Sequence, residues 1–272
     1  MYTKESLIND FITLGVPQDK TVIVHASLRA VGQIRGGGEV LLAALIEHIT
    51  KHGGRLLIPT HTWANVFEKK RIVLDITDPM TCIGALPNLA AVHPACCRTR
   101  HPTHSMAVFG KGKENYAALD EKSTTPASPD GCYGRIGKDG GYVLLLGVGQ
   151  NKNTYLHAVE EEILGKARYQ KTPTPMWIRT ENGEEKLCLM HEFDESVVGD
   201  VSCRFPKFEP LFREAGAIRE GTVGSASTQL CSAEKMREVM MLLYSYLNGQ
   251  DPLADDMPLP ALVTCNKERK QV

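Results

Sequence analysis

The sequence predicts an α/β protein in which a central mixed β-sheet is flanked by helices. Two segments carry this prediction, residues 21–41 and residues 142–161. Each begins with a short apolar run typical of a strand, passes through a loop that contains glycine, and continues as a helix pattern. A third observation is the order strand, helix, strand across residues 21–59, which predicts a parallel pair joined by a right-handed crossover. A chain of 272 residues is long enough for one large domain, or for two closely packed ones, with a substantial core.

The chain begins with an amphipathic helix pattern over residues 3–15, with Thr3 as a cap candidate and Gly15 at its end. Buried-type strands then alternate with a helix that opens at the three glycines of residues 36–38. These elements are the strand Thr21–Ala26, the helix Glu39–Lys51 and the strand Arg55–Pro59.

Between residues 60 and 78 the hydrophobic periodicity fades, and we predict a loop that covers a site. Residues 120–141 are rich in glycine and proline and are predicted to form turns. We expect a single domain over residues 1–272, with residues 250–272 as a flexible tail. The other expected elements are the helix Ile83–His93, the strand Tyr142–Val148, the helix Thr154–Leu164, a hairpin of Met176–Arg179 and Glu185–Met190, and the helices Phe205–Glu214 and Ala233–Leu247.

The charge balance excludes several kinds of partner. With 31 basic and 32 acidic residues the formal net charge is −1, so no long-range field favours nucleic acid or an anionic membrane. No run approaches the roughly 18 apolar residues of a membrane span, and the first residues lack the apolar stretch of a secretion signal.

The eight cysteines include no CxxC pair, which favours reduced, mostly buried thiols. We therefore expect a cytoplasmic enzyme.

The loop RAVGQIRGGG, residues 29–38, combines glycines, two arginines and a helix N-terminus. Glycine lets a backbone approach a phosphate closely, and the N–H groups and dipole at a helix N-terminus favour anions. The loop is therefore a candidate anion-binding site. It matches neither the P-loop nor the dinucleotide-binding pattern, so an ordinary glycine-rich turn is the alternative.

His157 lies in the segment NTYLHAVEE, where Asn153 or Thr154 can cap a helix and place His157 near its first turn. Glu160 and Glu161 follow at i+3 and i+4 on the same helix face. A carboxylate within reach can fix the imidazole tautomer and stabilise the imidazolium, as general-base catalysis requires. The alternative is a structural histidine, because a helix N-terminus lowers the pKa of a histidine.

Two other kinds of chemistry stay open. A serine or cysteine nucleophile could lie at Ser27, Ser105 or Cys132, although the GxSxG pattern is missing. A metal-dependent hydrolase is the other, although no HExxH or HxH spacing supports it and we expect no metal. Its candidate ligands are histidines at strand ends or in loops, which are His25, His61, His101, His104 and His157.

Acidic residues gather after the predicted hairpin and on the helix that carries His157. Together they could line a pocket for a cationic, polyamine-like substrate, while solvated surface charge is the alternative for each. The residues are Glu160–Glu162, Glu184, Glu185, Glu192, Asp194, Glu195 and Asp200.

Five stretches keep a characteristic order and spacing over nearly the whole chain. They are VHASLRAVG at 24–32, LLIPTHT at 56–62, HPTHSMAVFG at 101–110, SPDGCYGRIGKDGGYVLLLGVGQNKNTYLHAVEE at 128–161 and GTVGSASTQLCSAEKM at 221–236. Together they resemble the aminoglycoside 3-N-acetyltransferase family, antibiotic acetyltransferases unrelated to the GNAT fold. The block LLLGVG…NTxLHxxE is the most specific part of this resemblance.

The resemblance implies the family's own α/β fold, acetyl-coenzyme A as donor, and His157 as general base. The implied acidic partner of His157 is Asp200 by preference and Glu192 second. Glu160, the glutamate of the motif, is expected to orient His157 or to meet an ammonium group of the substrate. The implied coenzyme contacts, made chiefly through backbone groups, are Ala26, Ser27, Leu28, Arg29, Ala30 and Val31, with Ser105 as a further candidate.

The implied reaction is direct transfer of an acetyl group to the 3-amine of a 2-deoxystreptamine aminoglycoside. Acylation removes a positive charge and weakens the attraction of the drug to RNA phosphates, which would confer resistance. Small molecules are therefore the expected partners, for a monomer or a homodimer.

Some features depart from the family pattern. The first loop reads HAS where many members carry HSS, and residues 60–78 and 165–220 match loosely. The alternatives are an acetyltransferase of the same fold for another amine, a coenzyme A-binding protein without transferase activity, and the metal-dependent hydrolase.

Overall fold

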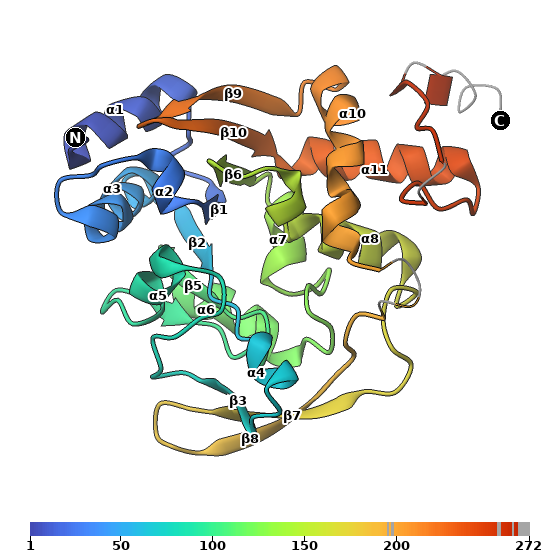
Figure 1. Ribbon diagram of the computed structural model, residues 1–272, viewed down its shortest axis with the longest axis horizontal. Helices are drawn as coiled ribbons and strands as arrows, with labels where there is room; N and C mark the ends of the chain where they lie inside the picture. The colour runs from blue at the N-terminus through green and yellow to red at the C-terminus, as the bar shows by residue number, and fades with distance from the viewer. Residues whose placement is uncertain (195, 197–198, 255–256, 263, 266–272) are drawn as a thin grey trace.

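The computed structural model describes residues 1–194, 196, 199–254, 257–262 and 264–265. A seven-stranded mixed sheet forms its centre, in the order β4-β5-β2-β1-β6-β10-β9 (Figure 1). Strands β1, β2 and β6 run parallel, while β5 and β10 are antiparallel to their neighbours β2 and β6. The strands are β1 (Thr21–Ala26), β2 (Arg55–Pro59), β4 (Cys97–Arg98), β5 (Met106–Gly110), β6 (Tyr142–Leu146), β9 (Ile218–Val223) and β10 (Ala226–Ser232).

Helices cover both faces of this sheet. Side chains alternate between the two faces along each strand, and the central strands carry apolar side chains on both, so each face must be covered. Val22 and Val24 of β1 join one core cluster, with residues of the N-terminal helices, whereas Ile23 joins the cluster on the opposite face. The first face carries α1 (Lys4–Leu14), α3 (Gly37–Thr50) and α5 (Ala85–Ala91), with the short α2 (Leu28–Val31) at its edge. The second carries α6 (Lys113–Ala117), α7 (Cys132–Lys138), α8 (Tyr155–Leu164), α10 (Glu209–Glu214) and α11 (Ala233–Leu247).

A separate three-stranded sheet has the order β3-β7-β8 and lies at the far side of the molecule from α1 and α11 (Figure 1). Arg98 of β4 fastens it to the large sheet. This arginine is 7% exposed, and it donates hydrogen bonds to the carbonyl groups of Asp75, Ile76 and Asp78. The elements of this region are α4 (Ala64–Phe67), β3 (Ile72–Asp75), β7 (Thr174–Arg179) and β8 (Glu185–Met190).

Several predicted elements are confirmed at their boundaries. Helix α1 begins after Thr3, whose hydroxyl accepts from the Ser6 N–H, and ends at Gly15 with a left-handed φ of 77°. Strands β1 and β2 are parallel, and α3 joins them as expected. The hairpin β7–β8 is antiparallel, and α11 covers the predicted residues. The predicted mixed α/β architecture is therefore correct.

Other predictions are wrong in part. Residues 60–78 contain α4 and β3 rather than an open loop, and residues 120–141 contain α7. The hairpin of β9 and β10 was not predicted. The predicted helix Phe205–Glu214 is divided between the 3₁₀ helix η3 (Val201–Phe208) and α10. Two further 3₁₀ segments are η1 (Ala118–Lys122) and η2 (Gln150–Lys152).

The described part of the predicted tail packs on the second face of the large sheet. Leu253, Leu262 and Cys265 are at most 7% exposed and belong to the core cluster there. The rest of the tail, at 255–256, 263 and 266–272, lies outside the described residues. None of the described helices is long and apolar enough to cross a membrane.

Candidate active site

Histidines gather at one edge of the large sheet. His25 is the fifth residue of β1, His61 follows β2, and His157 is the third residue of α8, which follows β6. His104 joins them from the loop before β5, because β5 runs antiparallel to β2 and starts where β2 ends. The carboxyl ends of parallel strands are the usual position of ligand sites in α/β sheets, so this edge is the candidate active site.

Aromatic rings hold the imidazole of His157. Phe193, beyond β8, has its ring centroid 4.6 Å from that of His157, and Phe205 of η3 lies at 4.7 Å in an edge contact. Tyr169 stacks on Phe193 at 5.0 Å. His157 is half-buried, and its Nδ1 atom is buried without a hydrogen-bond partner among the described residues. This ring nitrogen therefore makes no hydrogen bond to the described part of the chain.

Burial determines the protonation state of His157. It lowers the pKa of the imidazole to about 4, since a charged ring would lose its hydration. The Asp200 carboxylate opposes this shift, and the Arg168 guanidinium adds to it. The ring is therefore neutral at neutral pH, the form that can accept a proton.

Asp200 is exposed and caps η3. Its carboxylate accepts hydrogen bonds from the N–H and hydroxyl of Ser202, at 3.1 and 2.6 Å, and from the Cys203 thiol at 3.0 Å. Partial burial raises the pKa of Asp200, but these hydrogen bonds outweigh it, so the net shift is downward. Asp200 is therefore an anion that acts on His157 through space, without a direct hydrogen bond between the two in the structure.

The other two carboxylates of the predicted set have different surroundings. Glu192 is half-buried beside Phe193 and accepts a hydrogen bond from the Thr174 hydroxyl at 3.3 Å. Glu160 is 1% exposed, and its carboxylate bonds to Arg168 at 2.9 Å and to the Tyr244 hydroxyl. The described hydrogen bonds of Glu160 are made to Arg168 and Tyr244 and not to His157, although both residues lie on α8.

The remaining acidic residues differ in their accessibility. Glu161 is half-buried, accepts from the Thr125 hydroxyl at 2.9 Å, and has a second carboxylate oxygen without a partner in the described structure. Burial raises the pKa of Glu161. Glu162 pairs with Arg237, while Glu195 lies outside the described residues.

The other histidines of the cluster are neutral and mostly engaged within the protein. His61 lies 2.6 Å from the Tyr133 hydroxyl, and its ring centroid is 4.3 Å from that of His104. His101 bonds to the carbonyl group of Thr125 at 2.9 Å. Within the described ranges, no three or more His, Cys, Asp or Glu side chains are grouped so that they could hold a metal ion.

The first loop offers fewer backbone groups than the resemblance implied. The N–H groups of Ala30 and Val31 donate to Ser27, and the Val31 carbonyl accepts from Ser225. The first N–H groups of a helix have no intrahelical partner, which leaves those of Leu28 and Arg29 for a ligand. Ala26 and Ser27 are half-buried, Arg29 is exposed, and the Val31 side chain is completely buried.

A surface cavity of about 620 Å³ borders this loop between α3 and α5. Leu28, Gly38, Leu89 and His93 are among its lining residues. A side chain at Gly38 would lie 2.9 Å from Leu89 and 3.0 Å from Leu28, so the glycine allows α3 to start close to both. The cavity thus begins beside the free N–H groups of α2.

Ser105 is fully buried at the start of β5. Its hydroxyl donates to the Thr60 carbonyl at 2.8 Å and lies 2.9 Å from the Thr60 hydroxyl. The residue therefore joins β2 to β5, and its contact with the coenzyme stays a prediction.

Sequence motifs do not reveal the residues that surround His157. Phe193, Phe205 and Arg168 come from the region 165–220, where the chain has no clear motif and matches the family loosely. Phe205 lies within η3, and only the fold shows that its ring meets His157 of α8.

The chain is similar to proteins of known family. The model of the family described as aminoglycoside 3-N-acetyltransferase matches residues 23–245. Aminoglycoside N(3)-acetyltransferase VII of Streptomyces paromomycinus is 28% identical over 256 residues, which cover 85% of this chain and 87% of that protein.

Two solved structures share the fold. A histidine-to-alanine mutant of aminoglycoside acetyltransferase AAC(3)-IVa, in complex with a gentamicin, superposes with a TM-score of 0.72 at 26% identity, covering 100% of this chain and 98% of that one. AAC-IIIb, as a binary complex with CoASH, superposes with a TM-score of 0.73 at 21% identity, covering 88% and 96%.

Proposed function

Because the chain belongs to the aminoglycoside 3-N-acetyltransferase family, a family of acyltransferases, we propose that it transfers an acetyl group from acetyl-coenzyme A to the 3-amine of a 2-deoxystreptamine aminoglycoside. The observation that supports this most is the placement of His157. It is a neutral imidazole with an unpartnered ring nitrogen, at the sheet edge where ligands bind in such folds. We also propose that the whole chain forms one catalytic domain.

His157 acts as the general base. The acceptor amine is mostly protonated at neutral pH and must lose a proton before its lone pair can attack. The low pKa of His157 keeps the ring unprotonated, and the Asp200 carboxylate stabilises the imidazolium as it forms. Asp200 is therefore the acidic partner of His157, with Glu192 as the second candidate.

The transfer is direct, without an acetylated enzyme. After the ammonium group has lost one proton to water, the free amine attacks the carbonyl carbon of the thioester while His157 takes a second proton from the nitrogen. The C–N bond forms and the carbonyl π electrons move to oxygen. The electrons on the oxyanion then re-form the carbonyl group as the C–S bond breaks, and the imidazolium gives its proton to the departing thiolate. Backbone N–H groups near the first loop stabilise the oxyanion between these steps.

The coenzyme lies along residues 26–31. The N–H groups of Leu28 and Arg29 and the exposed Arg29 guanidinium suit an anionic group, and the adjoining cavity offers an apolar surface at Leu28 and Leu89. Ala30 and Val31 shape this turn through their bonds to Ser27 rather than contacting the ligand with their N–H groups.

The acceptor is recognised by carboxylates near His157. Glu161, one turn further along α8, has an unpartnered oxygen, and Glu192 lies beside Phe193. Both suit the ammonium groups of an aminoglycoside. Acetylation then removes one of the charges that attract the drug to RNA, so the activity confers resistance.

Release of coenzyme A thiol from acetyl-coenzyme A tests this function, measured with a chromogenic disulfide across a panel of aminoglycosides. We expect release only when a drug is present, and none above background with the His157→Ala protein. Coenzyme binding without release for any drug would refute the aminoglycoside acceptor and point to another amine. Activity that follows bound metal and is lost with a chelator would instead favour the hydrolase.

A further inference from the structure

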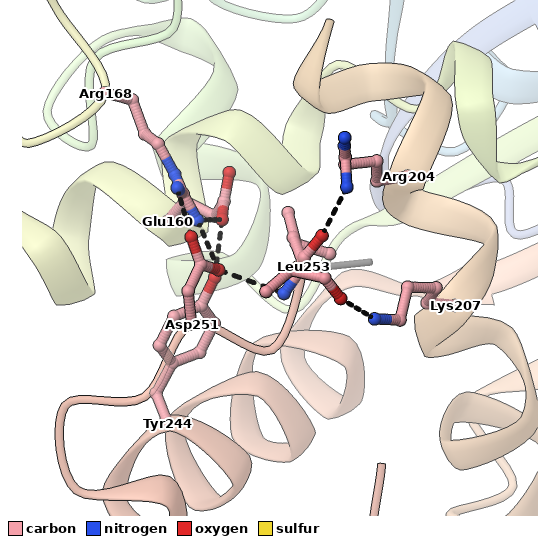
Figure 2. Close-up of polar contacts among 8 residues, drawn as sticks. Glu160, Arg168, Arg204, Lys207, Tyr244, Asp251 and Leu253 are labelled. Carbon is pink, nitrogen blue, oxygen red and sulfur yellow. Dashed lines mark hydrogen bonds and ion pairs between the residues drawn. The ribbon is translucent and has the colours of Figure 1, made fainter. Parts of the chain in front are cut away.

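An ion-pair network centred on a buried arginine ties the segment after α11 to α8 (Figure 2). The side chain of Arg168, 5% exposed, donates to both carboxylate oxygens of Asp251, at 2.6 and 2.9 Å. The same guanidinium donates to Glu160 of α8 at 2.9 Å. Tyr244 of α11 donates its hydroxyl proton to that same oxygen of Glu160. One cation is thus shared by two carboxylates from different parts of the chain.

The same segment also holds η3. Asp251 accepts a hydrogen bond from the Leu253 N–H at 2.9 Å, which turns the chain toward η3. There the Leu253 carbonyl accepts from Arg204 at 2.9 Å, and the Ala254 carbonyl accepts from Lys207 at 2.6 Å (Figure 2). The Leu253 side chain is completely buried.

These anchored elements are the ones that surround His157. Glu160 lies one turn beyond His157 on α8, and η3 contributes Phe205. The backbone carbonyl of Arg168 accepts from the Asp194 N–H at 2.9 Å, next to Phe193. The network therefore supports the helix of His157 and both of its neighbouring rings.

We propose that residues 251–254 form a clasp that positions His157 for catalysis, with Arg168 and Asp251 as positioning residues. The proposal rests on the proposed role of His157 as the base. Asp251 holds the guanidinium against Glu160 and fixes the turn that fastens η3. Without its carboxylate, Arg168 keeps one acidic partner, and η3 and Phe193 lose a shared anchor. A misplacement of about 1 Å can cost a reaction about a hundredfold in rate.

Opening the clasp also changes the charge around His157. The groups that act on it or face it are Asp200 from η3, Arg168 beyond α8, and the neutral rings of His61 and His104. Loss of the Asp251 charge leaves Arg168 less compensated. The imidazolium is then disfavoured, and the pKa of His157 moves further down.

The test compares Asp251→Asn with a matched control. Arg237→Gln opens another two-bond ion pair on α8, between Arg237 and Glu162 at 2.6 and 2.7 Å, which does not include Arg168. For Asp251→Asn we expect kcat to fall about tenfold and the KM for acetyl-coenzyme A to stay within about twofold. Asp251→Glu should restore most of the rate, and Arg237→Gln should change the melting temperature alone.

A second measurement is independent of activity. The ring signals of labelled histidine are followed by NMR against pH, with the His157 signal assigned from its absence in His157→Gln. We expect this signal to shift and to titrate at lower pH in Asp251→Asn. If Asp251→Asn folds poorly, Tyr244→Phe removes one hydrogen bond, keeps the ion pairs and should shift the signal to a smaller degree.

Two results would distinguish a failure of the proposed clasp from a failure of the proposed function. If Asp251→Asn and Arg237→Gln reduce stability alike, while kcat and the His157 titration stay as in the wild type, the segment only stabilises the fold and the proposal is wrong. If the wild-type protein transfers no acetyl group, the proposed function fails. The His157 signal in Asp251→Asn then still decides on the clasp, and an unchanged signal refutes it.

Discussion

At the scale of single residues, burial and a nearby carboxylate have opposite effects on the pKa of His157. His157 needs a dry position to meet a thioester, but burial is the main cause that lowers its pKa, to a net value of about 4, and this makes it a weak base. Asp200 is placed at the exposed start of η3, where hydrogen bonds from Ser202 and Cys203 keep it ionised. Its charge partly restores the basicity of the imidazole.

Asp200→Asn therefore tests the partnership directly. The amide can still accept from the Ser202 N–H but carries no charge, so the pKa of His157 should fall further. We expect kcat to decrease by about tenfold or more, and the acid limb of the pH–rate profile to move to lower pH. Asp78→Asn is the control, because Asp78 caps the Met80 N–H at 2.8 Å in a similar way. Equal rates for the two variants would contradict the role of Asp200.

At the scale of elements, α7 depends on its glycines. A Cβ at Gly134 would lie 2.1 Å from the Pro129 carbonyl oxygen, and one at Gly137 would lie 2.1 Å from the Tyr155 hydroxyl. Gly137 thus lets α7 pack closely against Tyr155 of α8, the helix of His157, while Gly134 lets α7 start close to the backbone of Pro129.

Gly134→Ala should therefore destabilise the protein, since backbone atoms must move to admit the methyl group. We expect a loss of about 1–3 kcal/mol in the free energy of unfolding, measured with urea. Gly149→Ala is the control, because its nearest neighbour is 3.4 Å away and its φ is −104°. A loss in Gly134→Ala no larger than in this control would refute the packing argument.

The same glycines explain why α7 could not be predicted from the sequence. Gly134 and Gly137 lower helix propensity, and only their contacts with Pro129 and Tyr155 show why they are there. Strand β3 was missed for another reason, since it pairs with β7, which lies far along the chain. By contrast, local patterns are sufficient for β1, β2 and α11.

The candidate site likewise combines residues that local motifs indicate with residues that only the fold brings together. His157 and the first loop can be proposed as site residues from the sequence because each lies within a recognisable local motif. Phe193, Phe205 and Arg168 were missed because their importance comes from contacts between segments distant in sequence. Glu160 shares a helix face with His157, as predicted, but the fold directs its carboxylate to Arg168 and Tyr244.

At the scale of the whole molecule, five histidines with lowered pKa values lie in and around the candidate site. Burial lowers these pKa values, to about 3 for His25 and about 4 for His157. The full set is His25, His61, His101, His104 and His157.

This arrangement predicts acid sensitivity. The unfolded chain binds protons to these histidines near pH 6.5, whereas the folded chain does not, so stability is complete above pH 6.5 and falls as the pH decreases toward the folded pKa values. Each histidine contributes about 1.4 kcal/mol per pH unit in that range. Urea unfolding at pH 7.5, 6.0 and 5.0 measures the slope, which His25→Gln should reduce. A free energy of unfolding that is constant between pH 7.5 and 5.0 would contradict the account.

The most direct test of the central claim is chemical rescue of the base. Acetyl transfer to an accepted aminoglycoside is measured for the wild type and for His157→Ala, with and without added imidazole, and the acetylated amine is identified by NMR. We predict acetylation at the 3-amine by the wild type, loss of transfer in His157→Ala, and partial recovery with imidazole in the emptied position. A His157→Ala protein that transfers acetyl groups at the wild-type rate would show that His157 is not the base.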